Sequence, residues 1–202
     1  MNKILLATGN RNKYREIKKE LSEIGIETLF PADEGIELER PESGDTYLEN
    51  ARIKADEGFE KSGLPSLADD SGLEVDALDG APGIYSDRWA GEDLTCEQKN
   101  KYLLEKLEDV PEEERTARFI CEMTLVDDSE QLFSTRGVCE GRIASAPRGE
   151  RGFGYDPVFE VKQADFKTFG ELPPRTKNWI SHRALALNRM ISLIREHLIE
   201  TS

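Results

Sequence analysis

Cysteine and histidine are scarce in this chain of 202 residues, which has three cysteines and two histidines. Cys96, Cys121 and Cys139 are scattered without a Cys-x-x-Cys spacing, which indicates a reducing compartment and no disulfide framework. A zinc site built from several histidine and cysteine ligands is disfavoured, because the chain has too few of these residues. Cys121 lies in an alternating apolar pattern, and we expect it in the core.

Long apolar runs are missing too. No stretch approaches the roughly 20 apolar residues that a membrane-spanning helix needs. The apolar run at residues 4–7 is too short for a signal peptide and leads into a polar loop. We therefore expect a cytoplasmic protein that does not enter a membrane.

Positive charge is in short supply, with 27 lysines and arginines against 41 aspartates and glutamates and a formal net charge of −14. A surface this acidic repels nucleic acids and anionic membranes, so we expect neither as a partner. A small polyanionic ligand remains compatible with this charge, provided that it meets a local basic pocket or a metal ion.

The order of the predicted elements indicates an α/β fold with a mixed sheet, because helices alternate with strands early and an antiparallel block follows. The apolar share of 37% suffices for a core, and we expect a single domain over residues 1–202. Strands are predicted over residues 4–7, 28–30, 66–68, 73–77, 117–125, 132–138 and 141–144. Helices are predicted over residues 12–25, 46–60, 94–107 and 181–199.

Two adjacent carboxylates, Asp69 and Asp70, follow the predicted strand at residues 66–68. They repel each other unless a divalent metal or a shared proton holds them together, although a solvated turn explains them equally well. Successive strand residues point to opposite faces, so one carboxylate is the better ligand unless the chain turns at Ser71-Gly72. Glu42 and Asp70 together would suit Mg²⁺, which takes few carboxylates.

The loop after the first predicted strand carries the second group of polar residues. Backbone N–H groups at a helix start attract phosphate, and Gly9 permits a close approach. Capping of the helix by an asparagine is the alternative explanation. The candidate phosphate-binding residues of this loop are Thr8, Gly9, Asn10, Arg11, Asn12 and Lys13.

Three further polar groups complete the candidate set. Asn50 and Lys54 share one face of a predicted helix, although a solvated face is the simpler interpretation for either residue alone. A loop of Phe153, Gly154, Tyr155 and Asp156 could stack on a planar base, whereas aromatic residues of this kind often fill a core. The last group, at the start of the final predicted helix, consists of Lys177, Ser181, His182 and Arg183.

In their order along the chain, these motifs resemble the inosine triphosphate pyrophosphatase family. The matching segments run from residue 7 to residue 184, and they include residues 67–73, 80–86 and 152–157. Each segment is weak alone, but the ordered set is specific. Residues 173–176, Pro-Pro-Arg-Thr, depart from the acidic helical turn that is usual in that family.

The resemblance implies a mixed α/β fold with an elongated central sheet flanked by helices, and two lobes with the active-site cleft between them. It also implies a homodimer and Mg²⁺-dependent hydrolysis of ITP, dITP and XTP to the monophosphate and pyrophosphate. By the same resemblance, Glu42 and Asp70 are metal ligands, and Asp70 is also the base that activates water. The implied substrate contacts are residues 8–13, Lys54, Ser71, residues 153–156, Lys177, His182 and Arg183.

This assignment makes chemical sense for purines that carry a 6-oxo group. Donors from His182 and Arg183 suit that oxygen, whereas the amino group of adenine would leave them unpaired at about 1–3 kcal/mol each. Two other hypotheses stay open: a nucleotide sensor that does not hydrolyse its ligand, and an enzyme acting on modified pyrimidine triphosphates.

Overall fold

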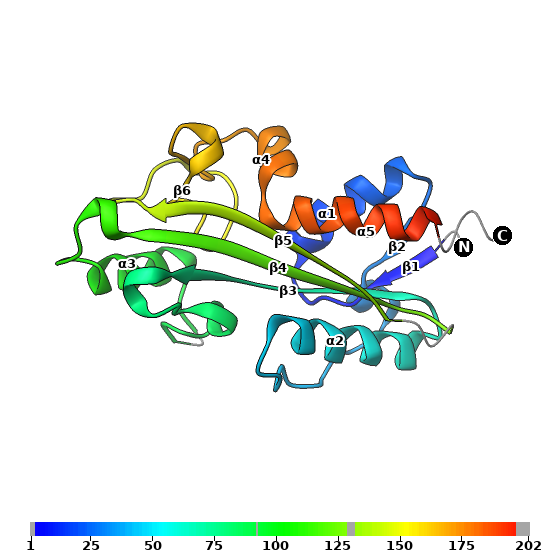
Figure 1. Cartoon of the computed structure of the whole chain (residues 1–202). Helices are drawn as coiled ribbons and strands as arrows, with labels where there is room; N and C mark the ends of the chain where they lie inside the picture. Colours follow the sequence, from blue (N-terminus) through cyan, green and yellow to red (C-terminus); the bar gives the residue numbers. More distant parts are fainter. Residues whose placement is uncertain (1–2, 92, 129–131, 197–202) are drawn as a thin grey trace. The chain divides into compact units, whose positions relative to one another are not determined.

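The structure is a computed structural model, and it describes residues 3–91, 93–128 and 132–196. Over these residues, seven strands form one mixed sheet in the order β2-β1-β3-β4-β5-β6-β7. The β1 strand pairs in parallel with β2 and β3, whereas β5, β6 and β7 pair antiparallel. The predicted α/β class with a mixed sheet is therefore confirmed (Figure 1).

The elements alternate between strands and helices in the first third of the chain, and the rest of the chain adds both further strands and further helices (Figure 1). The strands are β1 (Lys3–Leu6), β2 (Glu27–Leu29), β3 (Ser66–Val75), β4 (Thr116–Val126), β5 (Leu132–Ile143), β6 (Phe159–Val161) and β7 (Lys167–Thr168). The helices are α1 (Arg11–Glu23), α2 (Tyr47–Ser62), α3 (Cys96–Lys106), α4 (Pro174–Ile180) and α5 (His182–Ile194).

The chain divides into two compact units. Unit 1 comprises Met1–Asp70, Cys121–Gly137 and Ala184–Ser202, and unit 2 comprises Ser71–Ile120 and Val138–Arg183. Along the chain, the first boundary falls inside β3, directly after Asp70. We describe each unit by itself.

Unit 1 places its helices on both faces of its strands (Figure 1). Apolar residues of α1 and α5 pack on one face, where they bury Ile17, Leu21 and Met190 against strand residues such as Leu6. On the other face, Ala55 of α2 packs against Ala7 and Ala68, and these small residues allow a close approach of the helix. The spacing of apolar residues in α1 is that of a helix with one buried side.

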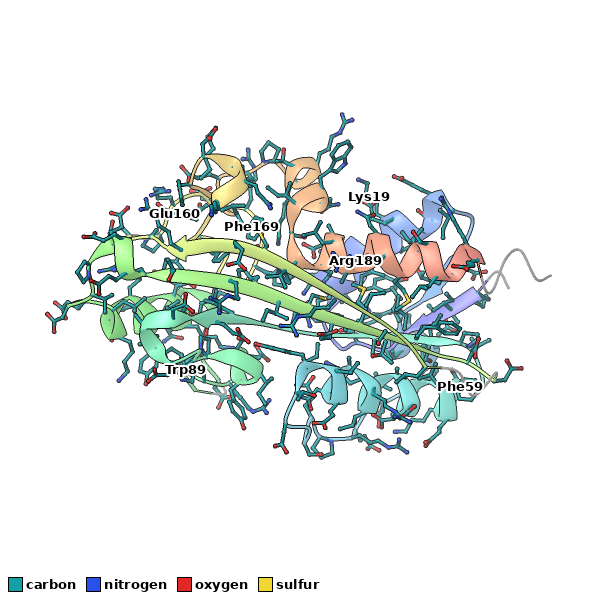
Figure 2. All side chains as sticks on the ribbon, viewed as in Figure 1. Lys19, Phe59, Trp89, Glu160, Phe169 and Arg189 are labelled. Atoms are coloured by element: carbon teal, nitrogen blue, oxygen red, sulfur yellow. The ribbon has the colours of Figure 1, made fainter. Side chains whose placement is uncertain are left out.

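Unit 2 has its own core, built around aromatic rings. Phe119, Phe159 and Phe169 pack against one another, with centroid distances of 4.7 to 6.1 Å. Leu103 of α3 belongs to the same core, and Trp89 packs against it from the outside. Figure 2 labels Phe169 and Trp89 among the side chains of this unit.

Three predicted boundaries differ from the structure. We predicted separate strands before and after Ser71-Gly72, but β3 continues through both residues, because Leu73 and Val75 are buried in the core of unit 2. Residues 132–138 and 141–144 likewise lie largely in one strand, β5. The predicted final helix, residues 181–199, corresponds to α5, which begins at His182, and its predicted end beyond residue 196 lies outside the described residues. The short helix α4, which ends just before Ser181, was not predicted.

A helix that crosses a membrane must be both long and apolar, and the helices within the described ranges can be compared with these two requirements. None of the helices there combines the length and the apolar character that a bilayer span requires.

The N-terminus of α2 gives a direct test of the folding signals. The side chain of Thr46 accepts a hydrogen bond from the backbone N–H of Glu49, and the side chain of Glu49 accepts one from the backbone N–H of Thr46, which confirms the predicted capping box. We expect Thr46→Ala to lower the free energy of unfolding by about 1 kcal/mol in urea denaturation followed by circular dichroism. Thr46→Ser, which keeps the hydroxyl, should stay near the wild type, and equal losses in both variants would contradict the capping role.

Candidate functional site

A lysine held between two carboxylates is the centre of the candidate site in unit 1. The Nζ atom of Lys54 lies 2.6 Å from Oε1 of Glu42 and 3.2 Å from Oδ1 of Asp70. Glu42 belongs to the connector before α2, Lys54 to α2 and Asp70 to β3. The structure thus brings together Glu42 and Asp70, the two predicted metal ligands, with Lys54, one of the predicted phosphate contacts. We call Glu42, Asp69, Asp70, Lys13 and Lys54 the carboxylate cluster.

Asn50 supports this arrangement from one turn earlier in α2. Its Nδ2 group donates to Oδ2 of Asp70 at 3.4 Å, and its Oδ1 atom accepts the backbone N–H of Gly44 at 2.9 Å. A Cβ atom on Gly44 would lie only 2.6 Å from Cβ of Glu49, so a glycine is required for this close approach. One buried amide therefore fixes both Asp70 and the connector that carries Glu42.

The charges of the cluster shift one another's pKa values. Burial alone would lower the pKa of Lys54, but three nearby carboxylates raise it above its ordinary value, so the amine stays protonated. Burial raises the pKa of Asp70, which the two lysines partly offset and the neighbouring carboxylates raise further. A carboxylate with a raised pKa is a stronger base than an ordinary aspartate, which suits proton removal from water.

Asp69 has different partners from Asp70, as strand alternation predicts. Its Oδ2 atom lies 3.0 Å from Nζ of Lys13 and 3.8 Å from Sγ of Cys121. Cys121 is buried, as the sequence indicated, and all three cysteines are free. Asp69 therefore anchors the lysine at the start of α1, which gives it a positioning role beside Asp70.

The loop before α1 caps the helix and also has free space beside Gly9. Asn10 is the N-cap of α1, and its side chain accepts the N–H groups of Asn12 and Lys13, so the capping alternative is correct for Asn10. The hydroxyl of Thr8 accepts the N–H of Asn10, and nothing lies within 4 Å of a Cβ placed on Gly9. The loop is preformed, and it leaves room for a ligand at the glycine. Its predicted contact with phosphate stays a prediction.

Arg11 in this loop is paired with a carboxylate. Its guanidinium pairs with Asp33 through two contacts of 2.5 and 3.1 Å and lies 4.2 Å from the ring centroid of Phe30. Both charged side chains are about half exposed, so a phosphate would compete with Asp33 for this arginine. Arg11 remains a predicted contact; like Lys13, which pairs with Asp69, it already has a carboxylate partner.

One face of α2 holds the cluster and its support. Asn50, Lys54 and Glu57 follow one another at spacings of four and three residues, which places them on the same side of the helix. Buried Glu57 accepts the backbone N–H groups of Glu39 and Arg40 at 2.8 and 3.1 Å. The interpretation of Asn50 as part of a solvated face is wrong, because its side chain is fully buried.

The oxygen donors fit a divalent cation of the magnesium type. Glu42 and Asp70 already direct one carboxylate oxygen each toward a shared cation, the ammonium of Lys54. Within the part of the chain that the structure describes, no group of three or more histidine, cysteine, aspartate or glutamate side chains could hold a metal. Mg²⁺ needs only one or two carboxylates when water and phosphate oxygens complete its shell, so this smaller donor set suits it.

In unit 2, the second group of candidate residues gathers around the ring of Phe153. Nζ of Lys177 lies 4.5 Å from the ring centroid, and the guanidinium of Arg183 lies 5.7 Å from it. Both cations are buried, whereas the ring is only half-buried. We call Phe153, Asp156, Lys177, His182 and Arg183 the aromatic–cation cluster. Buried cations beside an aromatic face provide donors and a stacking surface for a flat heterocycle.

Asp156 closes the loop that presents Phe153. Its Oδ2 atom accepts the N–H of Phe153 at 2.8 Å and pairs with Nζ of Lys177 at 2.6 Å. A Cβ atom on Gly152 would lie 1.9 Å from that carboxylate oxygen, and Gly152 has a φ of +81°, so only glycine fits there. The aspartate thus holds both the backbone of Phe153 and the ammonium of Lys177.

His182 and Arg183 begin α5 and are both buried. The imidazole of His182 stacks on Phe119 at a centroid distance of 4.6 Å and an interplanar angle of 11°. The guanidinium of Arg183 donates to Oγ of Ser71 at 3.0 Å. Three of the predicted substrate contacts, Ser71, His182 and Arg183, are therefore held by defined partners within unit 2.

Tyr155 is placed differently from the expectation of a stacking surface. Its ring lies in the core of unit 2, and its hydroxyl donates to the backbone carbonyl of Ser86 at 3.0 Å. The alternative interpretation, that aromatic residues of this loop fill the core, is correct for Tyr155 and not for half-buried Phe153. Its predicted contact with substrate remains untested.

Comparison with known protein families matches residues 4–193 to the Ham1 family. The chain belongs to the Ham1 family. It is 46% identical over 194 residues to a protein of Vibrio parahaemolyticus named dITP/XTP pyrophosphatase, with 95% of this chain and 96% of the relative covered. A Shigella flexneri protein of the same name is 44% identical over 199 residues, which cover 96% of this chain and 99% of the relative.

Solved structures agree with this membership in the Ham1 family. A HAM1 protein from Coxiella burnetii superposes with a TM-score of 0.87 at 39% identity, covering 97% of this chain and all of the other. A nucleoside-triphosphatase / dITP/XTP pyrophosphatase from Mycobacterium abscessus gives a TM-score of 0.74 at 40% identity, with 94% and 98% covered. The family resemblance found in the motifs is confirmed.

Two supporting residues of this Ham1-family chain escaped the sequence analysis. Glu57 fixes the connector before α2, and Asn100 of α3 donates to the carbonyl of Gly154 at 3.2 Å, which helps to hold the loop of Phe153. Both are buried polar residues inside helices. The spacing of Glu57 from Lys54 was a usable signal, whereas nothing in the sequence near Asn100 points to a loop 54 residues away.

The family segment at residues 173–176 differs in sequence but still forms a helix. Pro174 stands at the first position of α4, where a proline is tolerated because its missing N–H has no helical partner. Lys177 on this helix reaches Asp156. The departure from the usual acidic turn therefore leaves the lysine in place.

Glu57 yields a pH-dependent prediction. Burial alone would raise its pKa, but hydrogen bonds from Glu39 and Arg40 and from Lys61 lower it below the ordinary value of about 4.3. A lowered pKa in the folded state adds stability above the pKa of the unfolded state, and this stability is lost as the pH falls through the folded pKa. We expect Glu57→Gln to cost about 2 kcal/mol near pH 7 and less as the pH drops toward 3.

Urea denaturation of the wild type and of Glu57→Gln at several pH values measures this difference. Glu60→Gln is the matched control, because Glu60 lies one turn later in α2 and pairs only at the surface with Arg40. That variant should show a small loss at every pH. A loss for Glu57→Gln that stays constant down to pH 3 would contradict the role of its charge.

Proposed function

We propose that this chain hydrolyses ITP, dITP and XTP to the nucleoside monophosphate and pyrophosphate, and that it thereby removes non-standard purine nucleotides from the nucleotide pool. The observation that carries the proposal is the partly buried Glu42–Lys54–Asp70 contact, in a Ham1-family chain whose relatives are named dITP/XTP pyrophosphatases. The reaction is the cleavage of a phosphoric anhydride by water.

Within this proposal, Asp70 takes the proton of the attacking water. Burial and the neighbouring carboxylates make it a better base than an exposed aspartate, and Asn50 holds its second oxygen in a fixed direction. Lys13 and Lys54, with the N–H groups at the start of α1, offset the charge of the triphosphate. An acidic protein of net charge −14 needs these local cations to attract such a ligand.

Mg²⁺ is the cation that we propose for Glu42 and Asp70. When bound, it neutralises charge on the polyphosphate and on the leaving pyrophosphate. Oxygen donors of two carboxylates support a hard cation over a soft metal. Removal of divalent ions with a chelator is then expected to stop turnover, and Mg²⁺ is expected to restore it.

Purine selection is assigned to the aromatic–cation cluster. Phe153 offers a ring for stacking, while the buried donors of Lys177, His182 and Arg183 suit the oxo groups of hypoxanthine and xanthine. We further propose that residues 1–202 act as one functional domain and that the chain is a cytoplasmic homodimer. The lack of a disulfide among the three cysteines, all of which lie in the described residues, supports the location, and the dimer is what the resemblance of the motifs implies.

Substitution of the proposed base tests the mechanism. Asp70→Asn keeps the size of the side chain and accepts one of the two hydrogen bonds from Asn50 and Lys54, but it removes the base, so we expect kcat for ITP to fall by at least about a hundredfold. Pyrophosphate release measures the rate, and circular dichroism verifies the fold. Asp76→Asn is the control, since Asp76 also pairs with a cation, Arg118, outside the proposed site. Near-normal turnover by Asp70→Asn would exclude Asp70 as the base.

The position of bond cleavage is tested with labelled water. Hydrolysis of ITP in H₂¹⁸O should place the label in the monophosphate and leave pyrophosphate unlabelled, because water attacks the α-phosphorus. Separate assays for phosphate and pyrophosphate over ITP, dITP, XTP, GTP, ATP and methylated dUTP define the substrate class. Orthophosphate as the first product would contradict the proposal, and a preference for methylated dUTP would favour a pyrimidine enzyme. Tight ITP binding without product would indicate a sensor.

A further inference from the structure

Lys54 occupies the position that a bound cation would need. Its ammonium lies 2.6 Å from the Glu42 oxygen and 3.2 Å from the Asp70 oxygen. The second oxygen of Asp70 receives the amide of Asn50, so a metal that binds Asp70 shares Oδ1 with the lysine. The protein thus already contains one cation for the two carboxylates.

A metal and this ammonium are too close to share the pair. Mg²⁺ binds oxygen at about 2.0–2.1 Å, so a metal on the contacted oxygen of Glu42 would lie within roughly 5 Å of the present position of Nζ. A divalent and a monovalent cation at that separation, in a partly buried site, repel strongly. The repulsion falls only when the flexible lysine side chain turns away.

We propose that the Lys54 ammonium is an internal competitor of the divalent cation, and that the cation binds only as this ammonium leaves the Glu42–Asp70 pair. The inference rests on the proposed function and adds a regulatory step to it. Free metal must displace Lys54 without offering it a new partner. A metal–triphosphate complex offers phosphate oxygens to the displaced ammonium, so metal and substrate binding reinforce each other.

The balance of charge favours such an exchange. The carboxylate cluster contains three carboxylates and two lysines, and Lys13 is committed to Asp69 at 3.0 Å. Lys54 is therefore the cation that Glu42 and Asp70 share. Its release exposes both carboxylates to the metal. Because Lys54 is part of α2, the displaced amine stays within one side-chain length of its own backbone position in the site.

Metal binding without substrate tests this competition. We expect Lys54→Met to bind Mn²⁺ at least about tenfold more tightly than the wild type, as measured by electron paramagnetic resonance of free Mn²⁺ and by calorimetry. Lys3→Met is the matched control, because it removes the same charge from unit 1 at an exposed pair with Glu27. The control should stay within about threefold of the wild type.

A second variant covers the case in which Lys54→Met does not fold. Lys54→Gln removes the charge but keeps a donor for one carboxylate, and it should also bind Mn²⁺ more tightly. In wild type labelled with ¹⁵N-lysine, the Nζ resonance of Lys54 is identified as the one that is missing from the NMR spectrum of Lys54→Gln. This resonance should shift when Mg²⁺ binds. The inference would be overturned if both lysine variants bound Mn²⁺ no more tightly than the wild type. An Nζ signal that stays unchanged at saturating Mg²⁺ would overturn it as well.

These outcomes are separate from those of the proposed function. If the wild type forms IMP and pyrophosphate while the Lys54 variants bind metal no more tightly, the competition is wrong and the enzyme assignment stands. If the variants bind metal more tightly but the wild type forms no product, the function is wrong and the competition stands.

Discussion

The contact of one ammonium with two carboxylates organises the candidate site of unit 1. Glu42, Lys54 and Asp70 come from a connector, a helix and a strand, so their meeting depends on how α2 is held against β3. The ammonium offsets the charge of both carboxylates in this partly buried site, where removing the lysine would leave the two carboxylates facing each other. Burial also raises the pKa of Asp70, which fits its proposed role as a base.

Helix α2 contributes more to this site than its sequence suggests. Its small residues allow it to lie close to the strands, where Ala55 touches Ala7 and Ala68. Its polar face supplies Asn50, which links Asp70 to Gly44, and Glu57, which fixes the backbone two and three residues before Glu42. Hydrogen bonds with α2 thus hold Asp70 directly, and they hold the backbone on both sides of Glu42.

Sequence reasoning succeeded where the signal was local. The capping box at Thr46, the core position of Cys121 and the different directions of Asp69 and Asp70 follow from spacing alone. Reasoning failed where burial by distant segments decided the outcome. Leu73 and Val75 keep β3 extended through Ser71-Gly72 because the core of unit 2 holds them, and no local pattern reveals this.

The same distinction applies to the candidate residues. Motif order identified the carboxylates and the cations, because these residues carry charge at recognisable spacings. The neutral residues that hold them, such as Asn100 beneath Gly154, were missed, since a buried amide has no characteristic neighbour in sequence. Tyr155 was predicted to contact the substrate because of its place in the loop, although its ring belongs to the core of unit 2.

The division of the chain between Asp70 and Ser71 has a consequence for how such an enzyme evolves. Each cluster draws the contacts described above from its own unit: Lys13, Asn50 and Lys54 serve the carboxylates, and Asp156, Lys177 and Ser71 serve the ring and the arginine. Under the proposed function, changes in unit 2 therefore alter recognition of the heterocycle while the carboxylate cluster in unit 1 is left intact. A descendant with a new base preference then needs changes in unit 2 alone.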